Sequence, residues 1–160
     1  MDPFQRSELA DLRMKKAKKY LRMFMMDNEE MNRLLGRKEL DDDRHELAII
    51  LTLSDWNTTA PVVGKHDIVS FPSLYLLLTG AAIQCLKMAG FYQSRNELTY
   101  NSGGSSFVRA NKTPYYQSWL ANLSSEFEAK KLQSKIQSNI AGALSGGGFS
   151  SEYDLVGYDW

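Results

Sequence analysis

The sequence predicts a mainly α protein: a helical bundle with one protruding β-hairpin and an extended C-terminal tail. Three observations lead to this prediction. Apolar residues recur at steps of three to five over several long stretches, which is the period of an amphipathic helix. The turn-rich run 101–105 separates two short β-type runs, 98–100 and 106–108, which predicts the hairpin. A glycine triplet at 146–148 ends the last helical pattern and begins the tail.

Length and composition favour one small domain without a disulfide or a membrane span. A chain of 160 residues buries a real but modest core. Lys and Arg total 19, as do Asp and Glu, so no global field attracts nucleic acid or a membrane. The single cysteine, Cys85, excludes an intrachain disulfide, and the first residues lack the apolar stretch of a signal peptide. The apolar run 74–86 is shorter than the roughly twenty residues that a bilayer helix needs, so no membrane partner is expected.

The first helix is expected to begin near Ser7 and to combine an apolar face with a basic one. Its apolar face consists of Leu9, Leu12, Ala17, Tyr20, Leu21 and Phe24. Its basic cluster consists of Arg13, Lys15, Lys16, Lys18, Lys19 and Arg22. This cluster is either a solvated helix face or a contact with DNA phosphates or with an acidic neighbouring subunit.

The second helix is expected to begin at the aspartate triplet 41–43 and to end before Pro61. Asp43 and Glu46 have the spacing of a capping box. His45, in the first turn, is expected to be solvated. The side chains expected to face the core are Leu47, Ile50, Leu51 and Trp56, with Ala48, Ile49 and Leu53 widening that face.

Two further helices complete the predicted bundle. Ser73 is expected to cap an apolar helix that runs to about Gln93, and its small residues 80–82 would let a neighbouring helix approach closely. After the hairpin, Thr113 and Pro114 open a helix expected from about Tyr115 to Leu144. Its apolar stripe is predicted to be Trp119, Leu120, Leu123, Phe127, Leu132, Ile136 and Ile140. Its solvated side is predicted to include Glu126, Glu128, Lys130, Lys131 and Lys135.

The tail 145–160 follows the predicted helical domain 1–144 and is expected to dock on a partner. Its predicted anchors on that partner are Phe149, Tyr153, Leu155, Tyr158 and Trp160. Aromatic residues are enriched where protein interfaces bury surface, and five apolar side chains within a dozen residues are unusual for a solvated terminus. A disordered end is the alternative interpretation.

No arrangement of residues in the sequence indicates an enzyme. His45 and His66 lie in different segments, and neither has a metal-ligand spacing with Cys85, so no metal and no catalytic residue is predicted. Cys85 lies in an apolar helix and is expected to be buried and inert. The glycines at 103–104 and 146–148 lack the lysine and the following helix of a phosphate loop, so no cofactor is predicted. The triplet 41–43 is explained by helix capping.

Several stretches between about residues 41 and 144 together resemble the head-to-tail adaptor (connector) proteins of tailed bacteriophages. They are LAIILTLSDWN at 47–57, FPSLYLLLTGAA at 71–82, QSRNELTY at 93–100, and the long helix beginning with YQSW at 116–119. This resemblance implies a virion structural protein, without enzymatic activity, that extends the DNA channel below the portal. Copies would form a ring, commonly twelvefold, that joins the portal to the tail.

The resemblance also implies partners and a location. The partners would be further copies of the chain, the portal protein and tail or neck proteins, with non-specific contact to translocating DNA. The protein would lie in the neck of the virion after assembly in the host cytoplasm. Two other virion roles, tail completion and a neck stopper, fit the same residues. The alternatives outside the virion are a small DNA-associated helical protein that uses the basic cluster and a helical enzyme of unknown chemistry.

Overall fold

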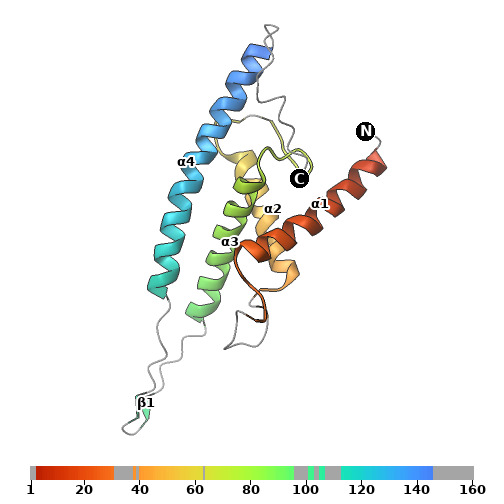
Figure 1. Ribbon diagram of the computed structural model, residues 1–160. Coiled ribbons are helices and arrows are strands. Elements are labelled where there is room, and N and C mark those ends of the chain that lie inside the picture. Colours follow the sequence, from red (N-terminus) through yellow and green to blue (C-terminus); the bar gives the residue numbers. More distant parts are fainter. Residues whose placement is uncertain are drawn as a thin grey trace.

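The computed structural model describes residues 3–30, 38, 40–62, 64–95, 101–102, 105–106 and 113–145. Its helices are α1 (Pro3–Phe24), α2 (Asp42–Thr58), α3 (Leu74–Arg95) and α4 (Thr113–Ser145). The apolar helix α3 lies between α2 and α4, and α1 crosses the bundle at a steep angle on the side away from α4 (Figure 1). The mainly α prediction is confirmed.

The predicted protruding hairpin is wrong. In that part of the chain, the only strands among the described residues are β1 (Asn101–Ser102) and β2 (Ser105–Ser106), each two residues long. They pair antiparallel with Asn101 opposite Ser106, so that three of the four paired residues lie in the run 101–105 that was predicted to be the turn. Apart from Ser106, the predicted strand residues 98–100 and 106–108 lie outside the described residues. A run of three β-type residues is too short to determine where two strands pair, and an isolated two-stranded ribbon is marginal in water.

The helix boundaries follow local capping with small differences from the prediction. α1 begins at Pro3 instead of Ser7, since proline is tolerated in the first turn of a helix. At α2 the N-cap is Asp41, whose carboxylate accepts a hydrogen bond from the Arg44 backbone N–H at 2.9 Å. The capping box predicted at Asp43 is therefore wrong. Ser73 does cap α3, its hydroxyl accepting a bond from the Leu76 backbone N–H.

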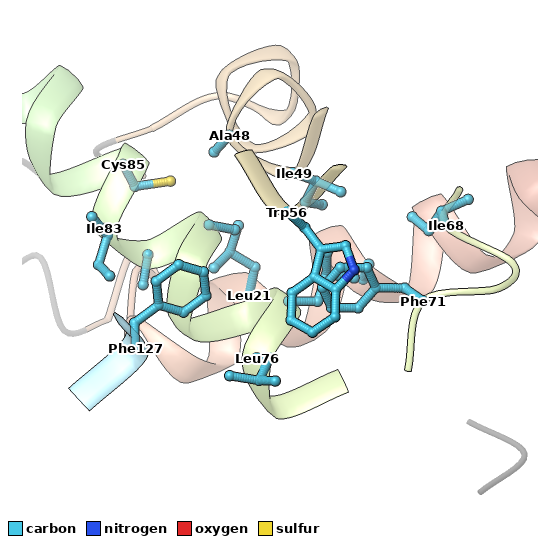
Figure 2. Packing of buried hydrophobic residues seen from close by; sticks show 14 of the residues in the cluster. Leu21, Ala48, Ile49, Trp56, Ile68, Phe71, Leu76, Ile83, Cys85 and Phe127 are labelled. Atoms are coloured by element: carbon cyan, nitrogen blue, oxygen red, sulfur yellow. The ribbon is translucent and has the colours of Figure 1, made fainter. Parts of the chain in front are cut away.

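The core lies where α2, α3 and the 66–71 connection meet, and α1 and α4 close it. The Trp56 and Phe71 rings meet edge-on with their centroids 5.0 Å apart (Figure 2). Leu21 from α1 and Phe127 from α4 join the same buried cluster. Gly80 lies at the closest approach of three helices, because its Cα faces Thr52 of α2 and the Phe127 ring of α4. The predicted close approach at residues 80–82 is thus confirmed.

Candidate functional site

The helix α2 has two apolar stripes on opposite sides, and only one of them is buried. The buried side chains are His45, Ala48, Ile49, Thr52 and Trp56, which recur at helical spacing on the side facing α3. Leu47, Ile50 and Leu51 lie on the other side and are 40–48% exposed. The prediction that these three residues face the core is wrong, because the small Ala48 and Thr52 allow α3 to pack closely on their side.

The helix α4 repeats this arrangement. Leu120, Leu123 and Phe127 pack on the core side, as predicted. Trp119, Leu132, Ile136 and Ile140, which were predicted to belong to the same stripe, are instead 45–63% exposed. At 3.6 residues per turn, Leu132, Ile136 and Ile140 lie on the side of the helix opposite Phe127, while Trp119 lies on its flank. We define the outer α2 face as Leu47, Ile50 and Leu51, and the outer α4 face as Leu132, Ile136, Ile140 and Leu144.

Lysines take the buried positions of α4 that the aliphatic residues were expected to fill. Lys131 and Lys135 continue the line of Phe127 at four-residue steps and are only 3% and 1% exposed. The ammonium group of Lys131 lies 2.8 Å from carboxylate oxygens of both Asp55 and Glu128. Burial opposes the charge on Lys131, but these two carboxylates outweigh it and raise its pKa. The prediction that the two lysines are solvated is wrong.

Lys135 caps the C-terminus of α2. Its Nζ donates hydrogen bonds to the carbonyl oxygens of Trp56, at 2.6 Å, and of Thr59. Carbonyls in the last turn of a helix lack intrahelical donors and carry the negative end of the helix dipole, so a cation is stabilised there. Burial and the nearby Lys131 lower the pKa of Lys135. The two lysines therefore fix α4 against α2 and turn its outer face away from the core.

Replacing Lys135 with methionine is expected to destabilise the fold by about 1–3 kcal/mol. The substitution keeps an unbranched side chain of nearly the same length and leaves the Trp56 carbonyl buried without its donor, which is the costly outcome. Urea denaturation followed by circular dichroism measures the change. Lys130→Met is the matched control, since Lys130 makes an exposed ion pair with Glu126 and its loss should cost much less than the loss of Lys135. Equal midpoints for the two variants would contradict the capping role.

The structure divides the predicted basic cluster of α1 into two groups. Arg13 donates to the Val69 carbonyl at 2.7 Å, and Lys18 pairs with Glu46 at 2.7 Å. Arg22 binds Asp42, at 2.6 Å, and also Asp27 and the Leu40 carbonyl. These three side chains stabilise the fold of the chain itself. The members of the cluster that remain exposed are Lys15, Lys16 and Lys19.

His45 lies beneath Arg22 and is fully buried, so the prediction that it is solvated is wrong. Its Nδ1 lies 2.8 Å from the Asp41 carbonyl oxygen, which fixes the proton on that nitrogen. Burial lowers the pKa of His45 below its ordinary value. The hydrogen bond to the Asp41 carbonyl opposes this shift, and the positive charge of Arg22 adds to it. The folded protein therefore favours the neutral imidazole.

Stability is expected to fall as the pH is lowered through the range just below 6.5. The unfolded chain takes up a proton at His45 near its ordinary pKa, while the folded chain binds that proton only at lower pH. The unfolded state then holds more protons, so acid favours it. Denaturation midpoints at pH 7.5 and pH 5.5 measure the effect, and His45→Gln should reduce the difference between them. An unchanged difference in His45→Gln would contradict this assignment.

The described residues contain no arrangement suited to catalysis. No group of three or more potential metal ligands lies together in the part of the chain that the structure describes. Burial raises the pKa of the Cys85 thiol to about 12, so the thiol stays protonated and inert, as predicted. A cavity of about 60 Å³ beside Gly80 is too small for a substrate. A shallow hollow of about 310 Å³ is lined by Lys131 and Lys135, whose ammonium groups are already bound within the chain.

The helix α3 passes a membrane-span test by length and composition over Leu74–Tyr92, although 56% of that stretch is buried inside the protein. Its position between α2 and α4 accounts for the apolar composition, since a central helix contacts protein on several sides (Figure 1). The result is weak evidence for a membrane span, and we interpret α3 as the core helix of the bundle.

Comparison with protein-family models, with curated proteins and with solved structures finds no match to this chain. The resemblance in the sequence to phage adaptors therefore stays a prediction. The predicted tail anchors at residues 149–160 lie outside the described residues. The candidate functional site that the structure describes consists of the outer α2 face, the outer α4 face and the exposed lysines of α1.

Proposed function

We propose that this chain is a virion structural protein, the subunit of a head-to-tail adaptor ring that joins the portal to the tail and extends the DNA channel. The ring subunit acts through its shape and its contacts, without bond chemistry. In this role the protein lies in the virion neck after assembly in the host cytoplasm. The sequence resemblance suggests a twelvefold ring with the portal and with tail or neck proteins as partners.

One observation carries the proposal: a single subunit has apolar outer faces on α2 and α4, the helices on either side of α3. Both faces expose aliphatic side chains that a monomer would leave in water. A contact between the outer α4 face of one copy and the outer α2 face of the next covers both faces with one kind of interface. Such a head-to-tail contact builds a ring when the rotation closes.

The end of α4 supports the same arrangement. From Ile136 to Ser145 the helix has no charged residue, and its described side chains are exposed almost without exception. A short helix without packing is marginal in water, so tertiary or subunit contacts must stabilise this end. Ile136, Ile140 and Leu144 recur at four-residue steps and form one line along it. A neighbouring copy packed on this line supplies the missing contact.

Imaging of tagged protein from cells that produce it tests the proposed function. Negative-stain images of the full chain should contain rings, some of them with a portal attached. A chain that ends at Leu144 should keep its helical circular dichroism and lose stable attachment, since it lacks the predicted anchors. Unchanged attachment after truncation would contradict the role of the tail. A monomer that carries nucleic acid and forms no ring would contradict the adaptor function.

The exposed lysines of α1 favour a second candidate, a small DNA-associated protein. Lys15, Lys16 and Lys19 could neutralise phosphates in a sequence-independent way. This candidate predicts DNA affinity that falls steeply with salt, and a triple substitution of these lysines by glutamine should remove it. The ring proposal predicts that the same variant still forms rings. Filter binding at two salt concentrations and sedimentation of the variant separate the two candidates.

A further inference from the structure

The outward side of α1 is both basic and apolar. Its exposed residues, which we call the basic α1 face, are Leu12, Lys15, Lys16, Lys19, Tyr20 and Met23. No acidic residue occurs between Leu12 and Met26, so all charges along this part of the helix are positive. Leu12 and Met23 are 51% and 65% exposed, which is high for apolar side chains. A ligand for this face must supply apolar groups and negative charges in alternation.

The segment 146–160 of the same chain has that composition. It contains Glu152, Asp154 and Asp159 and no basic residue. These acidic residues alternate with its large apolar residues, Phe149, Tyr153, Leu155, Tyr158 and Trp160. The segment thus matches the basic α1 face in charge and in apolar content.

We infer that segment 146–160 of one copy binds the basic α1 face of the neighbouring copy in the ring. This inference rests on the proposed ring, and it names the surface that receives the tail. The aromatic side chains cover Leu12, Tyr20 and Met23 and supply most of the affinity, because buried aromatic anchors dominate protein interfaces. The acidic side chains pair with Lys15, Lys16 and Lys19, and they fix the position of the segment more than its affinity.

The arrangement of the helices favours a neighbouring copy over the same copy. α1 and α4 lie on opposite sides of α3, so the basic α1 face points away from the helix that carries the segment (Figure 1). In the proposed ring, α4 of one copy packs on α2 of the next. In that next copy, α1 is held to α2 by the Lys18–Glu46 and Arg22–Asp42 ion pairs. These ion pairs lie at the start of α2, whereas α4 of the same copy contacts the end of α2 through Lys131 and Lys135, so the neighbour's α1 is the nearer one to the segment in the ring.

The length of the segment suffices for this contact. Fifteen residues in extended form, from 146 to 160, span roughly 50 Å. The basic α1 face between Leu12 and Met23 is about 16 Å long at the rise of an α-helix. The remaining length can bridge from the end of α4 at Ser145 to the neighbouring subunit.

Cross-linking of the full chain tests the inference. A photoreactive phenylalanine analogue replaces Tyr153, and the protein is prepared as an equal mixture of ¹⁴N and ¹⁵N copies. After illumination, mass spectrometry should find position 153 joined to residues 12–23 of α1, with about half of the cross-linked pairs carrying both isotopes. Pairs of a single isotope only would place the contact within one copy and overturn the inference. Cross-links that avoid α1 would overturn it as well.

A charge exchange provides the second measurement. Lys16→Glu with Lys19→Glu should reduce the yield of the 153–α1 cross-link at least fivefold, and adding Glu152→Lys with Asp154→Lys should restore it. The matched control is Lys65→Glu with Lys87→Glu, which makes the same change of charge at exposed residues outside the basic α1 face and should leave the yield unchanged. Equal losses in both pairs of substitutions would overturn the inference.

The two proposals fail in different ways. Sedimentation of the same samples reports the ring independently of the cross-link. Rings without a cross-link to α1 overturn the docking inference and leave the proposed function in place. A cross-link to α1 between two copies that form only a dimer supports the docking surface and contradicts the ring.

Discussion

Replacing Ile136 and Ile140 with glutamate is expected to convert the proposed ring into monomers without unfolding the chain. The two side chains are 45% and 54% exposed on the outer α4 face and do not belong to the buried core cluster. In the ring they would be buried against the outer α2 face of the next copy. Two carboxylates without partners in an apolar interface cost several kcal/mol, enough to lower the association constant by more than a thousandfold.

Sedimentation velocity measures the loss of the ring, and circular dichroism confirms that the fold is kept. Val62→Glu is the control, since Val62 is 64% exposed on a connection outside both faces. Leu47→Glu with Ile50→Glu on α2 should have the same effect as the α4 substitutions. An equal mixture of the α2 and α4 variants should form dimers only, because each variant keeps one intact face. Rings from either variant alone would contradict the assignment of the faces.

Replacing Gly80 with valine is expected to cause the largest loss of stability in the chain. A Cβ at Gly80 would overlap the Thr52 methyl group and lie 2.9 Å from the Phe127 ring. Both neighbours are buried and belong to different helices, so neither can move without displacing α2 or α4. Overpacking of a core typically costs about 1–3 kcal/mol. Valine adds two methyl groups beyond its Cβ, so we expect Gly80→Val to lower the free energy of unfolding by about 3 kcal/mol or more.

Gly90→Ala is the matched control for this substitution. Gly90 lies in the same helix, and a Cβ there would meet nothing within 4 Å. The change should stabilise the protein by about 0.5–1 kcal/mol, since alanine is the better helix former. Urea denaturation of both variants gives the comparison. Similar free energies of unfolding for Gly80→Val and the wild type would contradict the close packing of α2, α3 and α4.

The helical elements could be predicted from the sequence because their signals are local. Apolar spacing placed all the main helices, and the small residues around Gly80 indicated a close helix contact that the structure confirms. The hairpin could not be predicted in this way. Its β-type runs are three residues long, and so short a pattern does not determine pairing.

The orientation of the helices was harder to predict than their existence. α2 and α4 each carry two apolar stripes, and the rule that large aliphatic residues lie inside selects the wrong one for Ile50 and Ile136. The buried sides contain His45, Lys131 and Lys135. The two lysines bond to a carboxylate and to carbonyls at the end of α2, and His45 bonds to the Asp41 carbonyl at the start of its own helix. One signal was available: Lys131 and Lys135 follow Phe127 at four-residue steps and so share its side of the helix.

Disulfide trapping between the two outer faces tests the central claim most directly. A chain with both Leu51→Cys and Ile136→Cys is oxidised, while the native Cys85 is buried and inert. If the contact is head-to-tail, the double variant should form a ladder of covalent oligomers up to the size of the ring. A mixture of the Leu51→Cys chain and the Ile136→Cys chain should form only covalent dimers, each with one copy of either chain. A covalent dimer of Ile136→Cys alone, without a ladder from the double variant, would show a symmetric contact and contradict the account.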